Sequence, residues 1–186
     1  MGIDECGIWK EKVIMNFIII QGSARSDGNT NLIARILQEK LNAGFIDLKT
    51  KNINGYEYGY ENMDDDFMSV IREIIKYDAV IFITPVYWYA MSGLMKNFFD
   101  RITDCLKVEK ETGRKLRGKY LAAVSCSGDP DETEGFFVPF HNSAGYLGMH
   151  YLGDMHTWAD DDNTEVEPVV LERINAFVKQ LKKERG

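Results

Sequence analysis

Cysteine and proline are scarce in this 186-residue sequence, and the 22 Lys and Arg residues are fewer than the 29 Asp and Glu residues; the cysteine count and the charge balance exclude classes of protein. The three cysteines, Cys6, Cys105 and Cys126, lack the spacing of metal ligands, and an odd count suits reduced thiols better than a disulfide framework. The net charge of -7 argues against nucleic acid or an anionic membrane as the main partner. We therefore expect a cytoplasmic protein that binds neither.

Long apolar runs are also missing. No run approaches the roughly 18 residues that a membrane-spanning helix needs, and the residues before Val13 carry charges of both signs, unlike a secretory leader. Residues 1–12 show neither helical nor strand periodicity, so we treat them as an N-terminal arm. Residues 13–186 are then one domain, because 45% hydrophobic residues in a chain of this length suit a single full core.

Segments typical of buried strands alternate along the chain with segments typical of amphipathic helices. The strand-like runs are 14–20, 45–48, 79–83, 120–124 and 151–155, and a helical pattern follows each of them. Parallel strands need crossover helices that cover both faces, so the alternation predicts a doubly wound α/β fold with a five-stranded parallel sheet of order 2-1-3-4-5. Ligands of such sheets bind at the carboxyl ends of the first and third strands.

A loop rich in hydroxyl groups and glycine connects the first predicted strand to its helix. The loop reads QGSARSDGNTNL over residues 21–32, and it has neither the Lys-Ser or Lys-Thr pair of a Walker loop nor a G-x-G-x-x-G turn. The N–H groups of the helix N-terminus, the hydroxyls of Ser23, Ser26 and Thr30, and the cation of Arg25 together predict a site for a terminal monophosphate. An ordinary strand-to-helix turn with capping residues is the alternative.

Three adjacent aromatic residues, Tyr87, Trp88 and Tyr89, follow the third predicted strand within TPVYWYAMSG. Adjacent side chains cannot all face one core, so at least one ring should lie in the crevice, where a flat aromatic ligand can stack. Packing under the next helix or at a subunit interface is the alternative. The small residues Ser125 to Gly128 follow the next strand and offer N–H groups to the polar edge of a ring. A monophosphate at one end and a flat ring at the other describe flavin mononucleotide (FMN).

The motifs GSARSDGNTNL, TPVYWYAMSGLMKNFFDR and SCSGDP resemble those of the flavodoxin-like NAD(P)H-dependent FMN reductase family, which includes the iron–sulfur flavoproteins. The resemblance implies a flavodoxin-like fold, FMN as the cofactor, NAD(P)H as co-substrate, and a homodimer with residues 87–89 near its boundary. It also implies phosphate contacts and ring contacts, the former from Ser23, Arg25, Gly28, Asn29, Thr30 and Asn31 and the latter from Pro85, Val86, Tyr87, Trp88, Ser125 and Gly128.

One departure from the family concerns metal binding. Many relatives carry clustered cysteines after the second strand, but the corresponding loop here reads INGYEYGYENM and has no thiolate for a cluster. We therefore expect the flavin to be the only redox centre, Cys126 to be a packing residue, and residues 160–162, all aspartate, to be a solvated loop. We expect Lys96, Asp100 and Arg101 to be structural or to make dimer contacts.

The mechanism implied by the resemblance is hydride transfer in two half-reactions. Nicotinamide reduces the flavin and leaves, and a quinone, a free flavin or a nitro compound then takes the electrons at the same open face. This chemistry needs no catalytic acid or base, so we assign no catalytic role to His141, His150 or His156. The alternatives are a flavodoxin-type electron carrier without a nicotinamide site and an interaction module of the same fold that binds no flavin.

Overall fold

The computed structural model describes residues 15–131, 133–159 and 165–183. The expected N-terminal arm, residues 1–12, and the aspartates at 160–162 lie outside these ranges. Five strands form one parallel sheet: β1 (Phe17–Gln21), β2 (Gly44–Asp47), β3 (Ala79–Tyr87), β5 (Tyr120–Ser127) and β6 (His150–Trp158). Their order is β2-β1-β3-β5-β6, which confirms the predicted 2-1-3-4-5 arrangement of the main strands. A two-residue strand, β4 (Ala90–Met91), pairs antiparallel with the end of β3.

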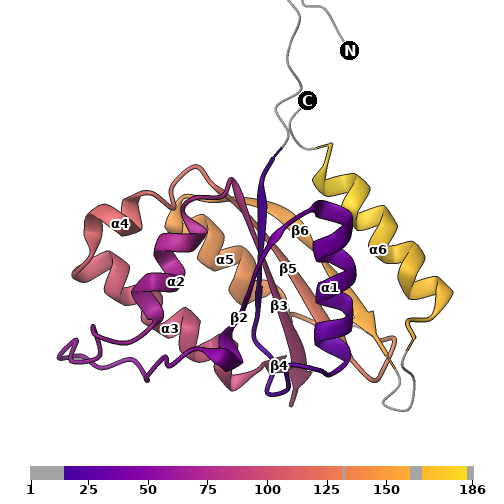
Figure 1. Cartoon of the computed structure of the whole chain (residues 1–186), viewed down its shortest axis with the longest axis horizontal. Coiled ribbons are helices and arrows are strands. Elements are labelled where there is room, and N and C mark those ends of the chain that lie inside the picture. The colour runs from indigo at the N-terminus through magenta and orange to yellow at the C-terminus, as the bar shows by residue number, and fades with distance from the viewer. Residues whose placement is uncertain (1–14, 132, 160–164, 184–186) are drawn as a thin grey trace, which may run out of the picture.

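Helices cover both faces of the sheet (Figure 1). On one side lie α1 (Asn29–Leu41) and α6 (Pro168–Leu181), and on the other lie α2 (Phe67–Ile74), α3 (Gly93–Lys107), α4 (Lys110–Arg114) and α5 (Val138–Leu147). Alternate residues of each strand enter the two cores: Ile19 and Ile81 pack with α1 and α6, whereas Ile18 and Val80 pack with α2 and α3. All five residues of β1 are buried, which explains the apolar run over 17–20 that precedes Gln21.

Three strands are longer than the sequence predicts, and of these β3 and β6 extend the furthest. We expected the third strand to stop at Pro85, but β3 continues to Tyr87 because Val86 and Tyr87 pair with β4 and not with the main sheet. The last strand extends from His150 to Trp158 because the paired register with β5 runs over its whole length. Both extensions lie at the edge of the sheet where the ligand site was predicted.

The long loop between η1 (Leu48–Thr50) and α2 is fixed by a buried arginine. Arg101 of α3 is 1% exposed, with Nη1 2.5 Å from Asp65 Oδ2 and Nε 2.6 Å from Asp104 Oδ2. Its Nη1 and Nη2 also donate to the main-chain carbonyls of Asn54 and Asn62 at 3.0 and 2.8 Å. Burial alone would raise the pKa of Asp65, but hydrogen bonds from Arg101 and from backbone N–H groups hold that pKa below its ordinary value. The contacts of Arg101 within the chain are therefore structural.

Candidate functional site

Hydrogen bonds tie the carboxyl ends of β1 and β3 together. The Gly22 N–H donates to the Ile83 carbonyl at 2.9 Å, and the Ser92 hydroxyl donates to the Gly22 carbonyl at 2.5 Å. The Ser92 hydroxyl also accepts a bond from the N–H of Met95 in the first turn of α3, so it joins the end of β1 to this helix, while the Ser92 N–H donates to the Thr84 hydroxyl of β3 at 3.0 Å. A Cβ at Gly22 would lie 2.9 Å from the Met95 side chain, so the close approach of β1 to α3 requires glycine.

The loop after β1 leaves the N-terminus of α1 open. The N-cap residue is Gly28, no side chain caps the helix, and the first turn holds no acidic residue. The Arg25 guanidinium folds over this turn, with Nε 3.2 Å from where a Cβ on Gly28 would stand. Ser23 and Thr30 are buried at 4% exposure, so their hydroxyls are held in the structure and not in bulk water. Uncapped N–H groups, a helix dipole and a guanidinium in one place suit a phosphate.

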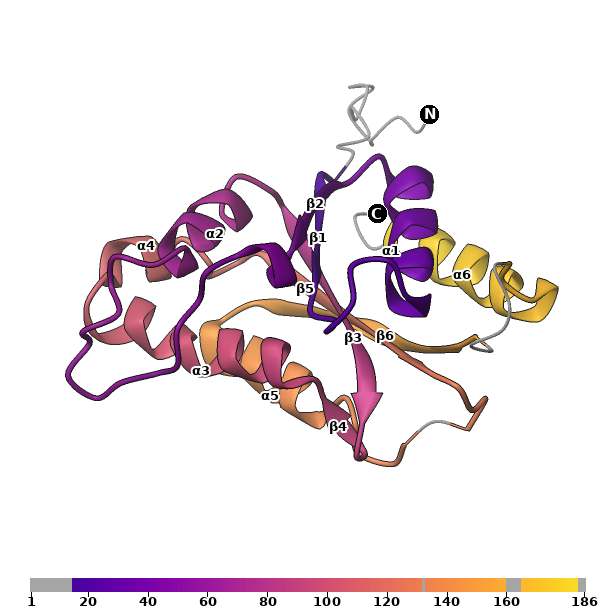
Figure 2. The same ribbon diagram turned by 60° about the horizontal axis from the view of Figure 1, so that its bottom comes forward.

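One cavity of about 230 Å³ brings the two predicted loops together at the carboxyl edge of the sheet. Figure 2 shows this edge, with the start of α1 on one side and the β3–β4 hairpin on the other. Nine of the predicted contact residues line the cavity, together with Cys126 and Ser127. The nine are Ser23, Arg25, Gly28, Asn29, Thr30, Pro85, Val86, Tyr87 and Gly128.

Three predicted contact residues do not line this cavity. The Asn31 amide donates to Gln21 Oε1 at 3.1 Å, which joins the start of α1 to the end of β1. Trp88 is 93% exposed at the tip of the hairpin. Ser125 is fully buried, and its hydroxyl lies 2.8 Å from His156 Nδ1. Asn31 and Ser125 therefore hold their neighbours in place.

Two residues that line the cavity, Cys126 and Ser127, were missed by the sequence analysis as contact residues. Both lie within the segment Ser125 to Gly128 that the sequence analysis had selected, so the segment was identified but not the side chains facing the cavity. Cys126 is buried at 3% exposure and also belongs to the hydrophobic core beside α1 and α6.

The β3–β4 hairpin has an unusual tip. Tyr87 pairs with Ala90, so the loop consists of Trp88 and Tyr89 alone, and both have positive φ, at 49° and 64°. Two-residue hairpin loops of this kind favour Asn and Gly, because a side chain at positive φ crowds the backbone. Here two large rings occupy these positions and stay 93% and 76% exposed. The tip thus holds aromatic surface in water beside the cavity at a cost in backbone strain.

A buried histidine braces the loop after β5. His156 of β6 is 1% exposed, and its Nε2 lies 2.9 Å from the carbonyl oxygen of Asp129. Its ring stacks against Trp158, with ring centroids 6.3 Å apart. The Ser127 hydroxyl also donates to the Asp129 carbonyl at 2.7 Å, and it accepts a bond from the Asp129 N–H at 3.0 Å. The loop that supplies Ser127 and Gly128 to the cavity is therefore held by a side chain of β6.

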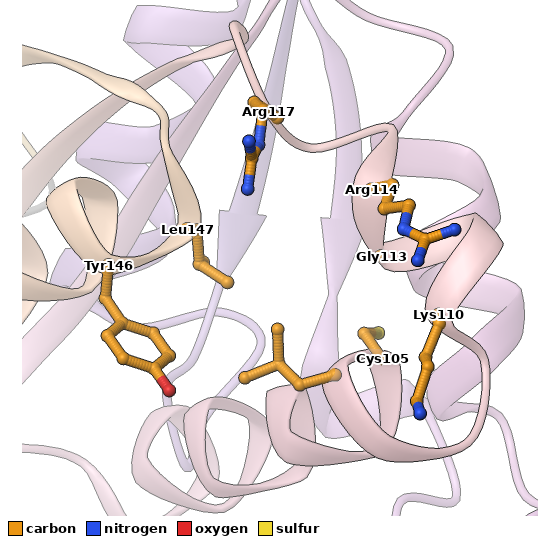
Figure 3. A pocket seen from close by; sticks show the side chains of 8 residues that line it. Cys105, Lys110, Gly113, Arg114, Arg117, Tyr146 and Leu147 are labelled. Atoms are coloured by element: carbon orange, nitrogen blue, oxygen red, sulfur yellow. The ribbon is translucent and has the colours of Figure 1, made fainter.

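A second cavity of about 200 Å³ lies beyond the other end of α3 (Figure 3). Arg117, Lys110 and Tyr146 stand around a floor that includes Leu147 and the Cys105 thiol. Burial raises the pKa of Cys105 to about 12, so this thiol stays protonated and unreactive at neutral pH. None of the predicted contact residues lines this cavity.

Two features are absent from the part of the chain that the structure describes. No group of three or more His, Cys, Asp or Glu residues within residues 15–131, 133–159 and 165–183 is placed to hold a metal ion. Over the same residues, no helix is long and apolar enough to cross a membrane.

The chain matches a protein-family model, related proteins and solved structures. The family model described as NADPH-dependent FMN reductase matches residues 15–164. The Bacillus subtilis protein YwqN, whose name describes an NAD(P)H-dependent FMN-containing oxidoreductase, is 28% identical over 149 residues, covering 75% of this chain and 82% of that protein. An iron–sulfur flavoprotein of Methanocaldococcus jannaschii is 28% identical over 152 residues, covering 75% and 77%. The solved structure of an NADH:FMN oxidoreductase without ligand superimposes with a TM-score of 0.70 at 15% identity, covering 92% of this chain and 90% of that one.

Proposed function

Because this chain belongs to the NADPH-dependent FMN reductase family, we propose that it transfers electrons from NAD(P)H through FMN to a small planar acceptor such as a quinone, a free flavin or a nitro compound. Family membership makes the protein an oxidoreductase that uses FMN with NAD(P)H as electron donor. The observation that carries the proposal is the single cavity lined by both Arg25 and Tyr87, which joins an anion site to an aromatic wall.

The residues present fit FMN at both ends. The uncapped first turn of α1 and the Arg25 guanidinium suit a phosphate dianion, and Pro85, Val86 and Tyr87 form an apolar edge for a flat ring. The cavity of about 230 Å³ is smaller than the roughly 300 Å³ at which typical ligand pockets begin. We infer that one face of the ring system stays uncovered, which an enzyme that exchanges donor and acceptor at one face requires.

The chain's own residues bind, orient and shield. FMN, when bound, supplies the two-electron chemistry that links nicotinamide to the acceptor. Ser23, Arg25 and Thr30 would hold the phosphate, and Tyr87 and Val86 would fix the plane of the ring. Ser127 and Gly128 would face its polar edge, where a Cβ at Gly128 would meet no atom within 4 Å. No side chain of the cavity has to move a proton in this scheme.

The exposed aromatic hairpin supports an acceptor of planar shape. A further cavity of about 400 Å³ is lined by Tyr89 of the hairpin tip, by Met91, Phe99, Phe136 and Pro139, and by the charged residues Lys96, Asp100 and Glu134, among others. The aromatic side chains of this lining favour a flat acceptor. The same exposed rings support a homodimer whose boundary runs near residues 87–89, which analytical ultracentrifugation of the loaded protein would test.

The decisive experiment is reduction of the FMN-saturated protein under anaerobic conditions. We expect the visible flavin absorbance to bleach rapidly on adding NADPH or NADH, and to return when a quinone is supplied. Absence of bleaching with either nucleotide, in a protein that retains FMN, would identify an electron carrier instead. A purified protein that takes up no FMN would contradict the proposal altogether.

A further inference from the structure

Sequence analysis assigned no catalytic role to His156 and placed Ser125 among the residues that contact the cofactor. In the structure both side chains are buried, at 1% and 0% exposure, and they face each other across the paired register of β5 and β6. We propose that His156 is a positioning residue that fixes the cavity-lining loop 127–129 through the Asp129 carbonyl, and that Ser125 acts on His156 and not on the cofactor. This inference rests on the proposed function only for its effect on FMN.

The hydrogen bonds of His156 assign the tautomer of its ring. The carbonyl oxygen of Asp129 can only accept, so the proton must be on Nε2, which lies 2.9 Å away. In the neutral ring Nδ1 is then an acceptor, and the Ser125 hydroxyl, 2.8 Å away, donates to it. The proton of Ser125 is therefore directed at His156 and not at the cavity.

The Asp129 carbonyl is the point where the loop is held. It accepts from His156 Nε2 at 2.9 Å and from the Ser127 hydroxyl at 2.7 Å. The Asp131 N–H donates in turn to Asp129 Oδ1 at 2.9 Å, so the chain is turned on both sides of Asp129. Of these bonds, only the one from His156 reaches the loop from another strand. Removing it would leave Asp129 with local contacts alone, while Ser127 stays tied to the end of β6 by the Ala159 N–H, which donates to the Ser127 carbonyl at 3.0 Å.

Replacing His156 by asparagine or by glutamine removes one of its two hydrogen bonds, to Asp129 or to Ser125, and keeps the other. A Gln amide nitrogen reaches the position of Nε2 and keeps the bond to Asp129, whereas an Asn side chain reaches only the position of Nδ1 and keeps the bond to Ser125. We therefore expect His156→Asn to weaken FMN binding about tenfold and His156→Gln to change it less than about threefold. His150→Asn, at an exposed position of the same strand, is the matched control and should leave FMN affinity unchanged.

Amide hydrogen exchange of the FMN-free protein is the second readout, and it does not depend on the proposed function. We expect the amides of Asp129 and Asp131 to exchange about tenfold faster in His156→Asn and at nearly the native rate in His156→Gln. Equal exchange in the two variants would overturn the proposal. If His156→Asn does not fold, His156→Ser, whose shorter side chain also cannot reach the Asp129 carbonyl, takes its place in the comparison with His156→Gln.

Ser125→Ala tests the second half of the proposal. If Ser125 acts on His156, this variant keeps the bond to Asp129, and its FMN dissociation constant should stay within about threefold of the native value. A tenfold weaker affinity with unchanged exchange of the loop amides would show that Ser125 contacts the cofactor directly, and would refute this half of the proposal. If the native protein binds no FMN, the proposed function fails, while the exchange data still test the role of His156.

Discussion

Replacing the hairpin tip by Asn-Gly should make the protein more stable and less active. The double variant Trp88→Asn/Tyr89→Gly places at both positions the residues that a two-residue loop with positive φ prefers. Left-handed backbone costs an ordinary residue about 1–2 kcal/mol, so relief at two positions amounts to roughly 3 kcal/mol.

Two opposing effects reduce this gain. Trp88 and Tyr89 are 93% and 76% exposed, so together they bury only about 60 Å² of apolar surface. Losing this burial lowers the free energy of unfolding by roughly 1.5 kcal/mol. The new glycine also raises the conformational entropy of the unfolded chain, which lowers the free energy of unfolding by about 0.7 kcal/mol. The free energy of unfolding should therefore rise by about 1 kcal/mol, and the melting temperature should rise by about 2–4 °C for a chain of this size.

Thermal and urea unfolding of the FMN-free protein measure the stability, and oxidation of NADPH by the FMN-loaded protein measures the activity. Tyr58→Asn is the control, because Tyr58 is 88% exposed and its φ is not positive, so its loss should change the free energy of unfolding by less than about 0.5 kcal/mol. A fall of 4 °C or more in the double variant would refute the reasoning, because it would mean that the rings are buried against something in solution.

Three further predictions concern charged and thiol side chains. Arg25→Gln should weaken FMN binding roughly 10- to 100-fold in a fluorescence titration, since a charged hydrogen bond to phosphate is lost, whereas Lys115→Gln, which removes an exposed charge outside the cavity, should not. Asp65→Asn should lower the free energy of urea unfolding by about 3–5 kcal/mol, because Arg101 would keep a buried charge with one partner fewer. The pKa of Asp65 is lowered on folding, so the native protein should hold this contribution above about pH 4 and lose it as the pH falls through the folded-state pKa. Cys105, with its pKa raised to about 12, should not react with a thiol reagent at pH 8 until the protein unfolds, so Cys105→Ser should leave the thiol count of the folded protein unchanged.

The sheet and the two main loops could be predicted because their signals are local. The apolar runs of β1, β3 and β5 are continuous in the sequence, and the alternation with helices fixes a parallel sheet and its order. The hydroxyl-rich loop and the aromatic loop can each be recognised from about a dozen consecutive residues. Their meeting at one cavity then follows from the topology, and the structure has them there.

What could not be predicted depends on register and on backbone conformation. Ser125 and His156 meet because β5 and β6 pair in a particular register, and two strands joined by a long crossover carry no local signal of that register. The hairpin tip gave no turn signal either, because Trp88 and Tyr89 are not residues that favour positive φ. Asn31 was selected by its place in the motif, yet in the structure its side chain bonds Gln21.

Arg101 fixes the loop before α2 through two main-chain oxygens of the loop and through the side chain of Asp65. Between the two main-chain oxygens that it binds, those of Asn54 and Asn62, lie seven residues, 55–61, none of which Arg101 contacts by a hydrogen bond among the described residues. Hydrogen bonds to main-chain oxygens do not depend on which side chains the chain carries there. The ends of this segment therefore stay fixed to α3 whatever side chains positions 55–61 carry, and the limits on its composition come from within the segment, from the positive φ of Tyr60 and the ring contacts of Tyr56.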